Sequence, residues 1–558
     1  MDDAIVDKRY SLVDEPWITV VYTDGTVRNV SLMTLFRDAP AIREITGEMP
    51  QMYFTTLRLA LAILYRAYEF PVLTKERLIE EWVAIWNQGT FDLDIVEGYL
   101  EDCRDGFDLL SFDRPFYQAA GLEYVGKECD PISELMPDIP KPDKFLFAMR
   151  SPKSVQELSL DEAARYIVLA QAYDIAGIKS PVQGSTHVSG GKVYAPKGAV
   201  GTGWCGAIGG VFLEGENLFQ TLLLNWALWD TARSGGPLAE REGDVPPWEL
   251  PSPGSDLSEV DPAGPVKALT WQSRRIRLVF DESRQKAVGV ISSYGDVTTA
   301  VDKQYCEIMT AWRESEAQRK RLGTVHVPWM PQQHDASKAL WRGLAPMLSS
   351  GSVLGAGKDL RPGVIVWAQG LLDSRAISPD RPLSLHAQGM AYGTQSSVFE
   401  DAINDRIDLC ALLFRDDSQA VFSVLEVVSQ ADAAVSELVK FVRSMELAAG
   451  DKRRSGSFDD DVRERAYDAL DQLFRERIFH FTTEVDPFDY CNVWRSDVRA
   501  CLWALACSYV DEAGRSLFAE HDGMTSGRAL HYFRAGLSRA LGSAGVDAHS
   551  NGSEDTSE

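Results

Sequence analysis

The stretch that most restricts the fold of this chain is residues 177–215, where eleven of 39 residues are glycine. Helical patterns lie on both sides of it, at Leu158–Ala176 and Asn217–Asp230. The stretch is therefore predicted to be a long loop, and such loops inside a compact domain are usually functional or mobile. Glycine permits positive φ and close backbone approach. The loop could thus hold phosphates, follow a nucleic-acid groove or be a flexible insertion.

The pattern of the chain changes near Ser418. Beyond it, apolar residues recur at alternating steps of three and four, which predicts a seam along one long helix. The seam residues are Val421, Val424, Val428, Ala431, Val435, Leu438, Val442 and Met445. Further helical patterns follow at about Asp459–Phe481, Phe488–Asp511 and Ser526–Leu541.

These patterns predict an α+β protein. We expect a large mixed N-terminal domain with long loops over 1–417, a C-terminal four-helix bundle over 418–542 and a disordered acidic tail over 543–558. A chain of 558 residues is too long for one hydrophobic core, and a hydrophobic content of 45% indicates a globular protein.

Shorter elements are predicted in the N-terminal domain. Asp24-Gly25 is a hairpin signal between two short strands, and Ser31 can cap the helix that follows. In a strand at Leu269–Phe280, Arg275 and Arg277 would form a basic face. The sequence also predicts helices at Met52–Glu69, Lys75–Trp86 and 334–354, a strand at Gly363–Gln369 and a small-residue loop at Gly389–Ser397.

The net charge of −26 argues against a free-standing nucleic-acid binder, although it allows local basic patches or a subunit beside more basic partners. The eight cysteines include no C-x-x-C pair, and we expect no signal peptide and no membrane span. A cytoplasmic protein with reduced thiols is therefore expected. Cys501 and Cys507 are predicted to be core thiols of the bundle.

One formal motif, a G-x-G-x-x-G, spans Gly201–Gly206. A dinucleotide-binding fold needs a strand before this motif and a helix opening within it. Here Pro196–Val200 is too short and broken for that strand, and Gly209-Gly210 would interrupt the helix. No P-loop, serine-hydrolase or zinc-protease motif is present, and the histidines do not cluster with acids. We expect no catalytic set, no metal and no cofactor.

A Pro-rich segment at 130–157 contains Phe145–Arg150, with Lys141, Lys144 and Lys153 around it. Aromatic side chains among bases suit stacking on unpaired nucleotides and contacts with phosphates. A short buried strand between two lysine-bearing turns explains the same pattern.

Five segments together resemble a known family. They are Leu12–Ile18, Val30–Phe36, Arg114–Gln118, Gly201–Trp226 and Leu269–Leu278. The chain resembles, over nearly its whole length, the large subunit of the type I-E CRISPR surveillance complex, Cascade (the CasA family), in which the C-terminus is also a four-helix bundle.

This resemblance implies a non-catalytic subunit for antiviral defence. Such a subunit contacts the 5′ handle of the guide RNA and recognises the protospacer-adjacent motif (PAM) of target double-stranded DNA from the minor groove. It also helps to open the duplex and recruits the helicase-nuclease effector. The implied partners are guide RNA (crRNA), target DNA, the backbone and small subunits of Cascade and the helicase-nuclease, with no membrane.

The resemblance also implies particular residues. A DNA-facing glycine turn aligns with Gly177, Ile178, Lys179 and Ser180. A lysine finger aligns with Lys320, nine residues before Trp329, and a glutamine wedge with Gln395 between Thr394 and Ser396. The loop that contacts the guide-RNA handle aligns with Phe147, Ala148, Met149 and Arg150.

Two departures from the family are visible. The turn has fewer glycines than in some relatives, so PAM preference is expected to differ and Lys179 to take part. Val279–Ala300 lacks the cysteine cluster of some relatives, so no zinc is expected. Two other hypotheses stay open: a nucleotide-dependent enzyme that uses Gly201–Gly210, and an interaction scaffold in which the bundle carries the function.

Overall fold

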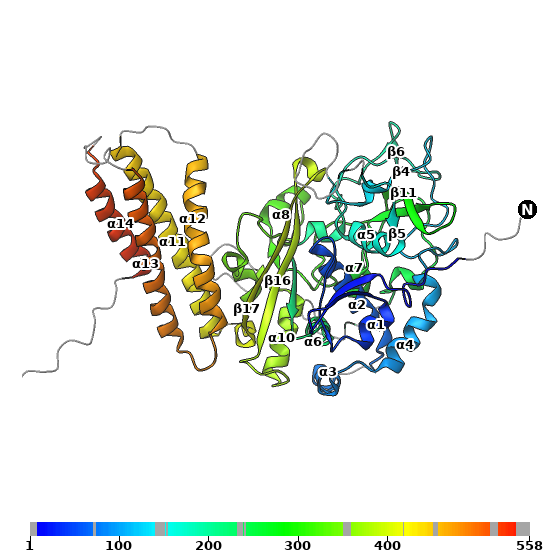
Figure 1. The fold of residues 1–558 in the computed structure, drawn as a ribbon, viewed down its shortest axis with the longest axis horizontal. Coiled ribbons are helices and arrows are strands. Elements are labelled where there is room, and N and C mark those ends of the chain that lie inside the picture. The colour runs from blue at the N-terminus through cyan, green and yellow to red at the C-terminus, as the bar shows by residue number, and fades with distance from the viewer. Residues whose placement is uncertain are drawn as a thin grey trace, which may run out of the picture. The chain divides into compact units, whose positions relative to one another are not determined.

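A computed structural model describes residues 8–70, 74–139, 151, 154–230, 238, 242–349, 359–416, 418–449, 456–513 and 523–542 (Figure 1). The chain divides into two compact units. The first comprises residues 1–378 and 383–407, and the second comprises residues 379–382 and 408–558. The domain boundaries drawn from the sequence, at 417 and 542, stay a proposal.

The first unit begins with a three-stranded antiparallel sheet in the order β2-β1-β3. Its strands are β1 (Ile18–Tyr22), β2 (Val27–Val30) and β3 (Ile42–Ile45). The hairpin predicted at Asp24-Gly25 is confirmed, and Gly25 has φ 83°. The predicted cap is also confirmed, because the Ser31 hydroxyl accepts a hydrogen bond from the Thr34 amide at the start of α1 (Leu32–Arg37).

Helix α2 (Gln51–Ala67) lies at the centre of this unit, with side chains buried on all its faces, as expected of an apolar helix in a core. It contacts β3 and four helices. These are α4 (Leu93–Asp102), α5 (Leu160–Tyr173), α6 (Leu218–Asn225) and α7 (Pro265–Leu269). The helix predicted at Lys75–Trp86 is α3 (Lys75–Gln88).

Two sheets position the segments that contain most of the candidate site residues. In the first, β11 (Lys286–Tyr294) pairs with β10 (Arg274–Phe280), and with the short strands β4 (Asp130–Pro131) and β5 (Leu158–Ser159). In the second, β16 lies between β17 and β8. Their bounds are β8 (Gly210–Glu214), β16 (Pro382–Tyr392) and β17 (Phe399–Cys410).

The remaining described elements are short. Helix α8 (Glu316–Leu322) lies between β13 (Trp312–Glu314) and β14 (Trp329–Pro331), which pair with each other. The others are β6 (Val188–Ser189), β7 (Lys192–Val193), β9 (Ser258–Glu259), β12 (Asp296–Val297), β15 (Asp359–Leu360) and the 3₁₀ turns at Arg104–Phe107, Ile132–Leu135, Trp204–Ala207, Pro247–Glu249, Leu340–Gly343, Thr394–Ser396 and Ala411–Phe414.

Three element predictions were wrong. The strand predicted at Gly363–Gln369 is helix α10 (Gly363–Asp373). Its buried residues recur at helical spacing, although the helix contains the β-branched run Val364–Val366. Within the described part of the helix predicted at 334–354, residues 334–349 form only the turn at Leu340–Gly343 and α9 (Ala345–Leu348), where Pro346 lacks an amide donor. The loop predicted at Gly389–Ser397 begins as the end of β16.

The second unit contains four long helices that pack side by side (Figure 1). They are α11 (Gln419–Ala448), α12 (Gly456–Phe479), α13 (Pro487–Ala513) and α14 (Ser526–Leu541). All eight seam residues of α11 are buried, so the heptad prediction is confirmed. Cys501 is half-buried, but Cys507 is exposed, so its prediction as a core thiol was wrong.

Candidate nucleic-acid interface

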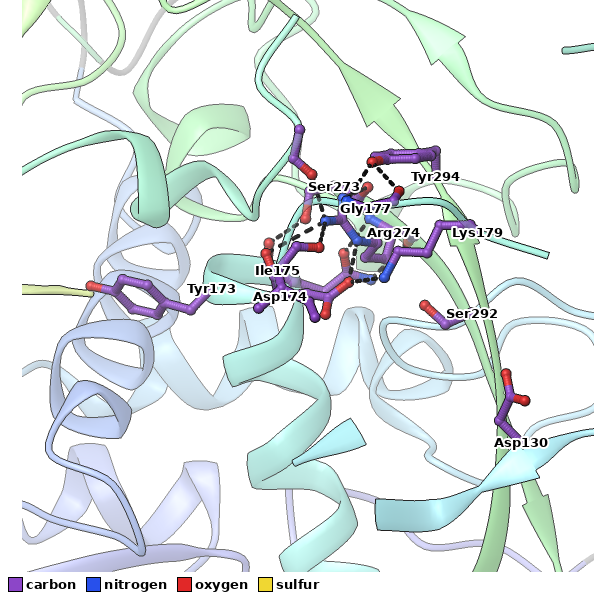
Figure 2. A network of polar contacts seen from close by, with 12 residues as sticks. Asp130, Tyr173, Asp174, Ile175, Gly177, Lys179, Ser273, Arg274, Ser292 and Tyr294 are labelled. Carbon is purple, nitrogen blue, oxygen red and sulfur yellow. Dashed lines mark hydrogen bonds and ion pairs between the residues drawn. The ribbon is translucent and has the colours of Figure 1, made fainter. Parts of the chain in front are cut away.

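The Gly177–Ser180 turn leaves the C-terminal end of α5 and passes the end of β11 (Figure 2). Gly177 has φ 146°, in the region that favours glycine. The Tyr294 hydroxyl donates a hydrogen bond to the Gly177 carbonyl at 2.7 Å, and the Gly177 amide donates to the same hydroxyl oxygen at 3.2 Å. One tyrosine thus fixes both backbone groups of the first residue of the turn.

A largely buried charge cluster fixes Lys179, the third residue of the turn (Figure 2). The Asp174 carboxylate pairs with the Lys179 ammonium at 2.6 Å and with the Arg274 guanidinium. Arg274, which is 1% exposed, also donates to the carbonyls of Gly201 at 2.7 Å and Ile175 at 3.0 Å. Lys179 is therefore held against the protein, whereas Ile178 is 54% exposed at the outer side of the turn.

The charge cluster predicts a pH dependence of stability. Burial by itself would raise the pKa of Asp174, but Lys179 and Arg274 outweigh it and lower the pKa from 3.8 to about 2. The pKa of Asp174 in the folded protein lies below its pKa in the unfolded chain. The contribution of the ionised Asp174 to the unfolding free energy is therefore present above pH 4 and is lost as the pH falls toward 2. We expect the deficit in unfolding free energy of Asp174→Asn, relative to wild type, to shrink by about 2 kcal/mol between pH 6 and pH 2. Urea unfolding of both proteins across this range measures it, and a deficit independent of pH contradicts the assignment.

The Gly201–Gly210 segment does not have the arrangement of a dinucleotide-binding fold. It forms a 3₁₀ turn at Trp204–Ala207 and continues into strand β8, where the motif requires a helix. Its glycines allow close packing instead. A Cβ on Gly203 would lie 2.2 Å from the Ala172 carbonyl carbon, and one on Gly206 would lie 2.4 Å from the Tyr392 hydroxyl. The argument from the sequence against a dinucleotide fingerprint is therefore confirmed, and the alternative hypothesis of a nucleotide-dependent enzyme gains no support from this segment.

The Gly201–Gly210 segment contacts the base of each of three candidate DNA-contacting elements: the glycine turn, the α8 region and the hairpin between β16 and β17. The Gly203 amide donates to the Asp174 carbonyl at 2.8 Å, beside the glycine turn. The Gly209 amide donates to the Gln332 carbonyl at 2.9 Å, just after β14 and the α8 region. The Tyr392 hydroxyl, packed over Gly206, donates to the Tyr173 carbonyl at 2.7 Å. The bases of these three elements therefore pack together around the Gly201–Gly210 segment.

Gln395 lies at the tip of the hairpin between β16 and β17. It is exposed and has φ 57° and ψ 23°, and Ser396 has φ 51°. The turn is closed by hydrogen bonds from the Gly393 amide to the Val398 carbonyl and from the Ser396 amide to the Gly393 carbonyl. Thr394 is exposed beside Gln395. The hairpin therefore presents the glutamine side chain outward on a closed turn.

Lys320 lies on α8 and is exposed. Its neighbour Arg319 pairs with Glu316 at 2.9 Å, and Arg321 is exposed. Trp329 begins β14, and its amide donates to the Asp302 carboxylate at 2.8 Å, which fixes the end of the connecting loop. A lysine on such a surface helix can approach phosphates or acceptors in a minor groove.

Sequence reasoning missed the residues that hold the turn: Asp174, Arg274 and Tyr294. A signal existed, because Arg274 shares the face of β10 with Ile276 and Leu278, and a buried arginine requires a partner. The predicted basic face was wrong for Arg275. Its guanidinium is buried, pairs with Asp296 at 2.7 Å and donates to the Gly254 carbonyl.

The predicted guide-RNA loop at Phe147–Arg150 lies outside the described residues, as does the predicted acidic tail. Within the part of the chain that the structure describes, no three or more His, Cys, Asp or Glu side chains come together in a way that could hold a metal ion.

Comparisons with known proteins agree over nearly the whole chain. The family model for CRISPR-associated protein Cse1 matches residues 11–505. The crystal structure of Thermobifida fusca Cse1 is 31% identical, with a TM-score of 0.86, and the match covers 96% of this chain and 98% of that chain. Cse1 from Acidimicrobium ferrooxidans is 26% identical, with a TM-score of 0.78 and coverages of 96% and 99%. No curated protein matches the chain.

A third solved structure, a chain of a CRISPR RNA-guided surveillance complex, has a TM-score of 0.69 at 16% identity, over 96% of this chain and 99% of that chain. At this identity the likeness shows the fold alone. The family resemblance drawn from the sequence is confirmed by these matches.

Proposed function

This chain belongs to the CRISPR-associated Cse1 family, and from that premise we propose that it is the non-catalytic large subunit of an RNA-guided surveillance complex in the cytoplasm. In this role it contacts the guide-RNA handle, recognises the PAM of target duplex DNA and helps to open the duplex. The family match over residues 11–505 is the observation that carries the proposal. No helix among the described residues is long and apolar enough to cross a membrane.

The geometry of the glycine turn supports its role at the PAM. A narrow minor groove admits a protein segment only where few side chains project, and binding costs less entropy when the segment is ordered beforehand. Gly177 has no side chain, and its backbone groups are fixed by Tyr294. Ile178 is exposed beside it. We place the groove contact at this turn, with Ser180 at its far end.

The hairpin tip and α8 have complementary roles in the proposal. Gln395 is the wedge that occupies the stack of the first displaced base pair, with Thr394 and Ser396 beside it. An inserted side chain offsets part of the unstacking free energy, which is a few kcal/mol per step. Lys320 supplies a positive charge to the minor groove. Guide pairing then supplies sequence specificity.

The proposed partners follow from this role. They are the guide RNA, bound through Phe147, Ala148, Met149 and Arg150, the target duplex, the backbone and small subunits and the helicase-nuclease. The net charge of −26 fits a subunit that binds DNA within an assembly of more basic partners. The direct test is to reconstitute the surveillance complex without this chain. Unchanged binding of PAM-bearing duplex would contradict the proposal.

Two substitutions separate the proposed steps. We expect Lys320→Ala to weaken binding of PAM-bearing duplex roughly tenfold, about 1.4 kcal/mol, because a charge at the groove is lost. Gln395→Ala should slow duplex opening, read from a fluorescent base at the first displaced pair, while leaving initial PAM contact intact.

Matched controls exist for both. Lys338→Ala removes an exposed lysine that pairs with Asp335, and should leave binding unchanged. Gln395→Met keeps the length of the side chain and should retain more of the opening rate than alanine. If Lys320→Ala and Gln395→Ala both behave as wild type, these site assignments are wrong even though the family is shown.

A further inference from the structure

Residues 188–193, in the middle of the glycine-rich stretch, form a short hairpin beside the glycine turn. Strands β6 and β7 pair around Gly190-Gly191, which have φ 59° and 71°, as a tight two-residue hairpin turn requires. The Lys179 amide donates to the Val193 carbonyl and the Val193 amide to the Lys179 carbonyl, both at 3.0 Å. The backbone at Lys179 therefore pairs with β7, on the side of β7 opposite β6.

The base of this hairpin is attached to the body of the first unit. The Asp256 carboxylate accepts hydrogen bonds from the Ser185 hydroxyl at 3.1 Å and the Thr186 amide at 3.1 Å, and contacts a ring nitrogen of His187 at 3.1 Å. With the turn at one side and Asp256 at the other, the hairpin has a defined position. It presents a defined surface to whatever the turn contacts.

That surface is basic and aromatic. Val193 is buried, so its neighbours Lys192 and Tyr194 share the opposite face of the strand, and both are exposed. Lys197 is exposed three residues further on. Among the described residues, the ammonium groups of Lys192 and Lys197 make no hydrogen bond or ion pair, in contrast to that of Lys179, which pairs with Asp174. The nearby acid Asp256 is engaged by the hairpin base.

We propose that the β6–β7 hairpin is a second, sequence-independent contact to the target duplex, in which Lys192 and Lys197 bind phosphates of the DNA backbone. Directly opposite residues in an antiparallel pair lie about 5 Å apart, so a duplex that receives the glycine turn passes beside Val193 and its neighbours. Free ammonium groups on flexible stems can follow its phosphates. This inference rests on the proposed function.

The test is duplex binding by the reconstituted complex carrying Lys192→Gln and Lys197→Gln together, measured over a series of salt concentrations. Each phosphate contact contributes about 0.9 to the magnitude of the negative slope of log binding constant against log salt concentration. The magnitude of the slope should therefore decrease by about 2, and the PAM preference should be retained. Both lysines are exposed, and thermal unfolding of the free chain should match wild type.

Lys286→Gln is the matched control. Lys286 is partly exposed on β11, and its ammonium lies 3.6 Å from the Glu157 carboxylate. It is eight residues from Tyr294, which at strand spacing is about 26 Å from the turn. Its salt slope should stay that of wild type. If the double variant keeps the wild-type slope while Lys320→Ala weakens binding, the hairpin inference is overturned and the proposed function stands. If a complex without this chain binds the duplex as the complete complex does, both the proposed function and the hairpin inference are wrong.

Discussion

Replacing Arg274 with alanine is expected to destabilise the first unit by about 3 kcal/mol, because it removes a fully buried guanidinium from an ion pair and leaves its hydrogen-bond acceptors unpaired. Asp174 would keep one cation, Lys179, and the carbonyls of Ile175 and Gly201 would lose a donor. Arg274 also lies over the Tyr294 ring, 4.9 Å from its centroid, and Tyr294 holds Gly177. The glycine turn should therefore lose its fixed conformation together with the stability.

Two measurements distinguish these effects. Chemical unfolding of the free chain reports the stability, and protease cleavage or amide exchange within 177–180 reports the order of the turn. Arg277→Ala is the matched control, since Arg277 lies on the same strand and donates to the Leu122 carbonyl at 3.0 Å without contacting the turn. Wild-type protection of the turn in Arg274→Ala would show that the cluster does not hold it.

The second large effect is expected for Arg58→Ala at the centre of the first unit. The Arg58 guanidinium binds both carboxylate oxygens of Glu307, at 3.0 and 2.8 Å, and both side chains are almost fully buried. The Trp204 indole donates to the same carboxylate at 2.7 Å. Leaving Glu307 buried with no cation should cost about 3–5 kcal/mol and shift the Gly201–Gly210 segment through Trp204.

The double variant Arg58→Met with Glu307→Gln tests the electrostatic cause. It removes both charges but keeps an acceptor for the Trp204 indole, so it should recover much of the stability lost in Arg58→Ala. The comparison is made by urea unfolding. If the double variant is as unstable as Arg58→Ala, the lost stability comes from the packing of the arginine side chain. That result would contradict a dominant role for the unpaired Glu307 carboxylate.

Local patterns predicted the elements whose stability is local. The seam of α11 and the limits of α14 follow from helical spacing, and the hairpin at Asp24-Gly25 follows from turn chemistry. Segments 363–369 and 334–354 were mispredicted, because burial against neighbouring elements overrode the strand propensity of a β-branched run and because one proline divided a helical pattern.

The site was predictable only in part. Resemblance to the family led to the turn, Lys320 and Gln395, whose exposure is compatible with contact. The residues that hold the glycine turn are far apart in sequence: Asp174, Arg274 and Tyr294 meet only because β10 and β11 pair beside the end of α5. No local pattern encodes a partner one hundred residues away.

The sequence by itself determined the family, the helical C-terminal unit and the concentration of glycine in 177–215. Only the tertiary structure decided what each glycine does. Gly177 and Gly190 adopt positive φ in turns, whereas Gly203 and Gly206 admit the backbone of α5 and the Tyr392 ring where a Cβ would collide. The physical reason is that backbone angle and distance to a neighbour both depend on the packed fold, while the residue type is the same in every case.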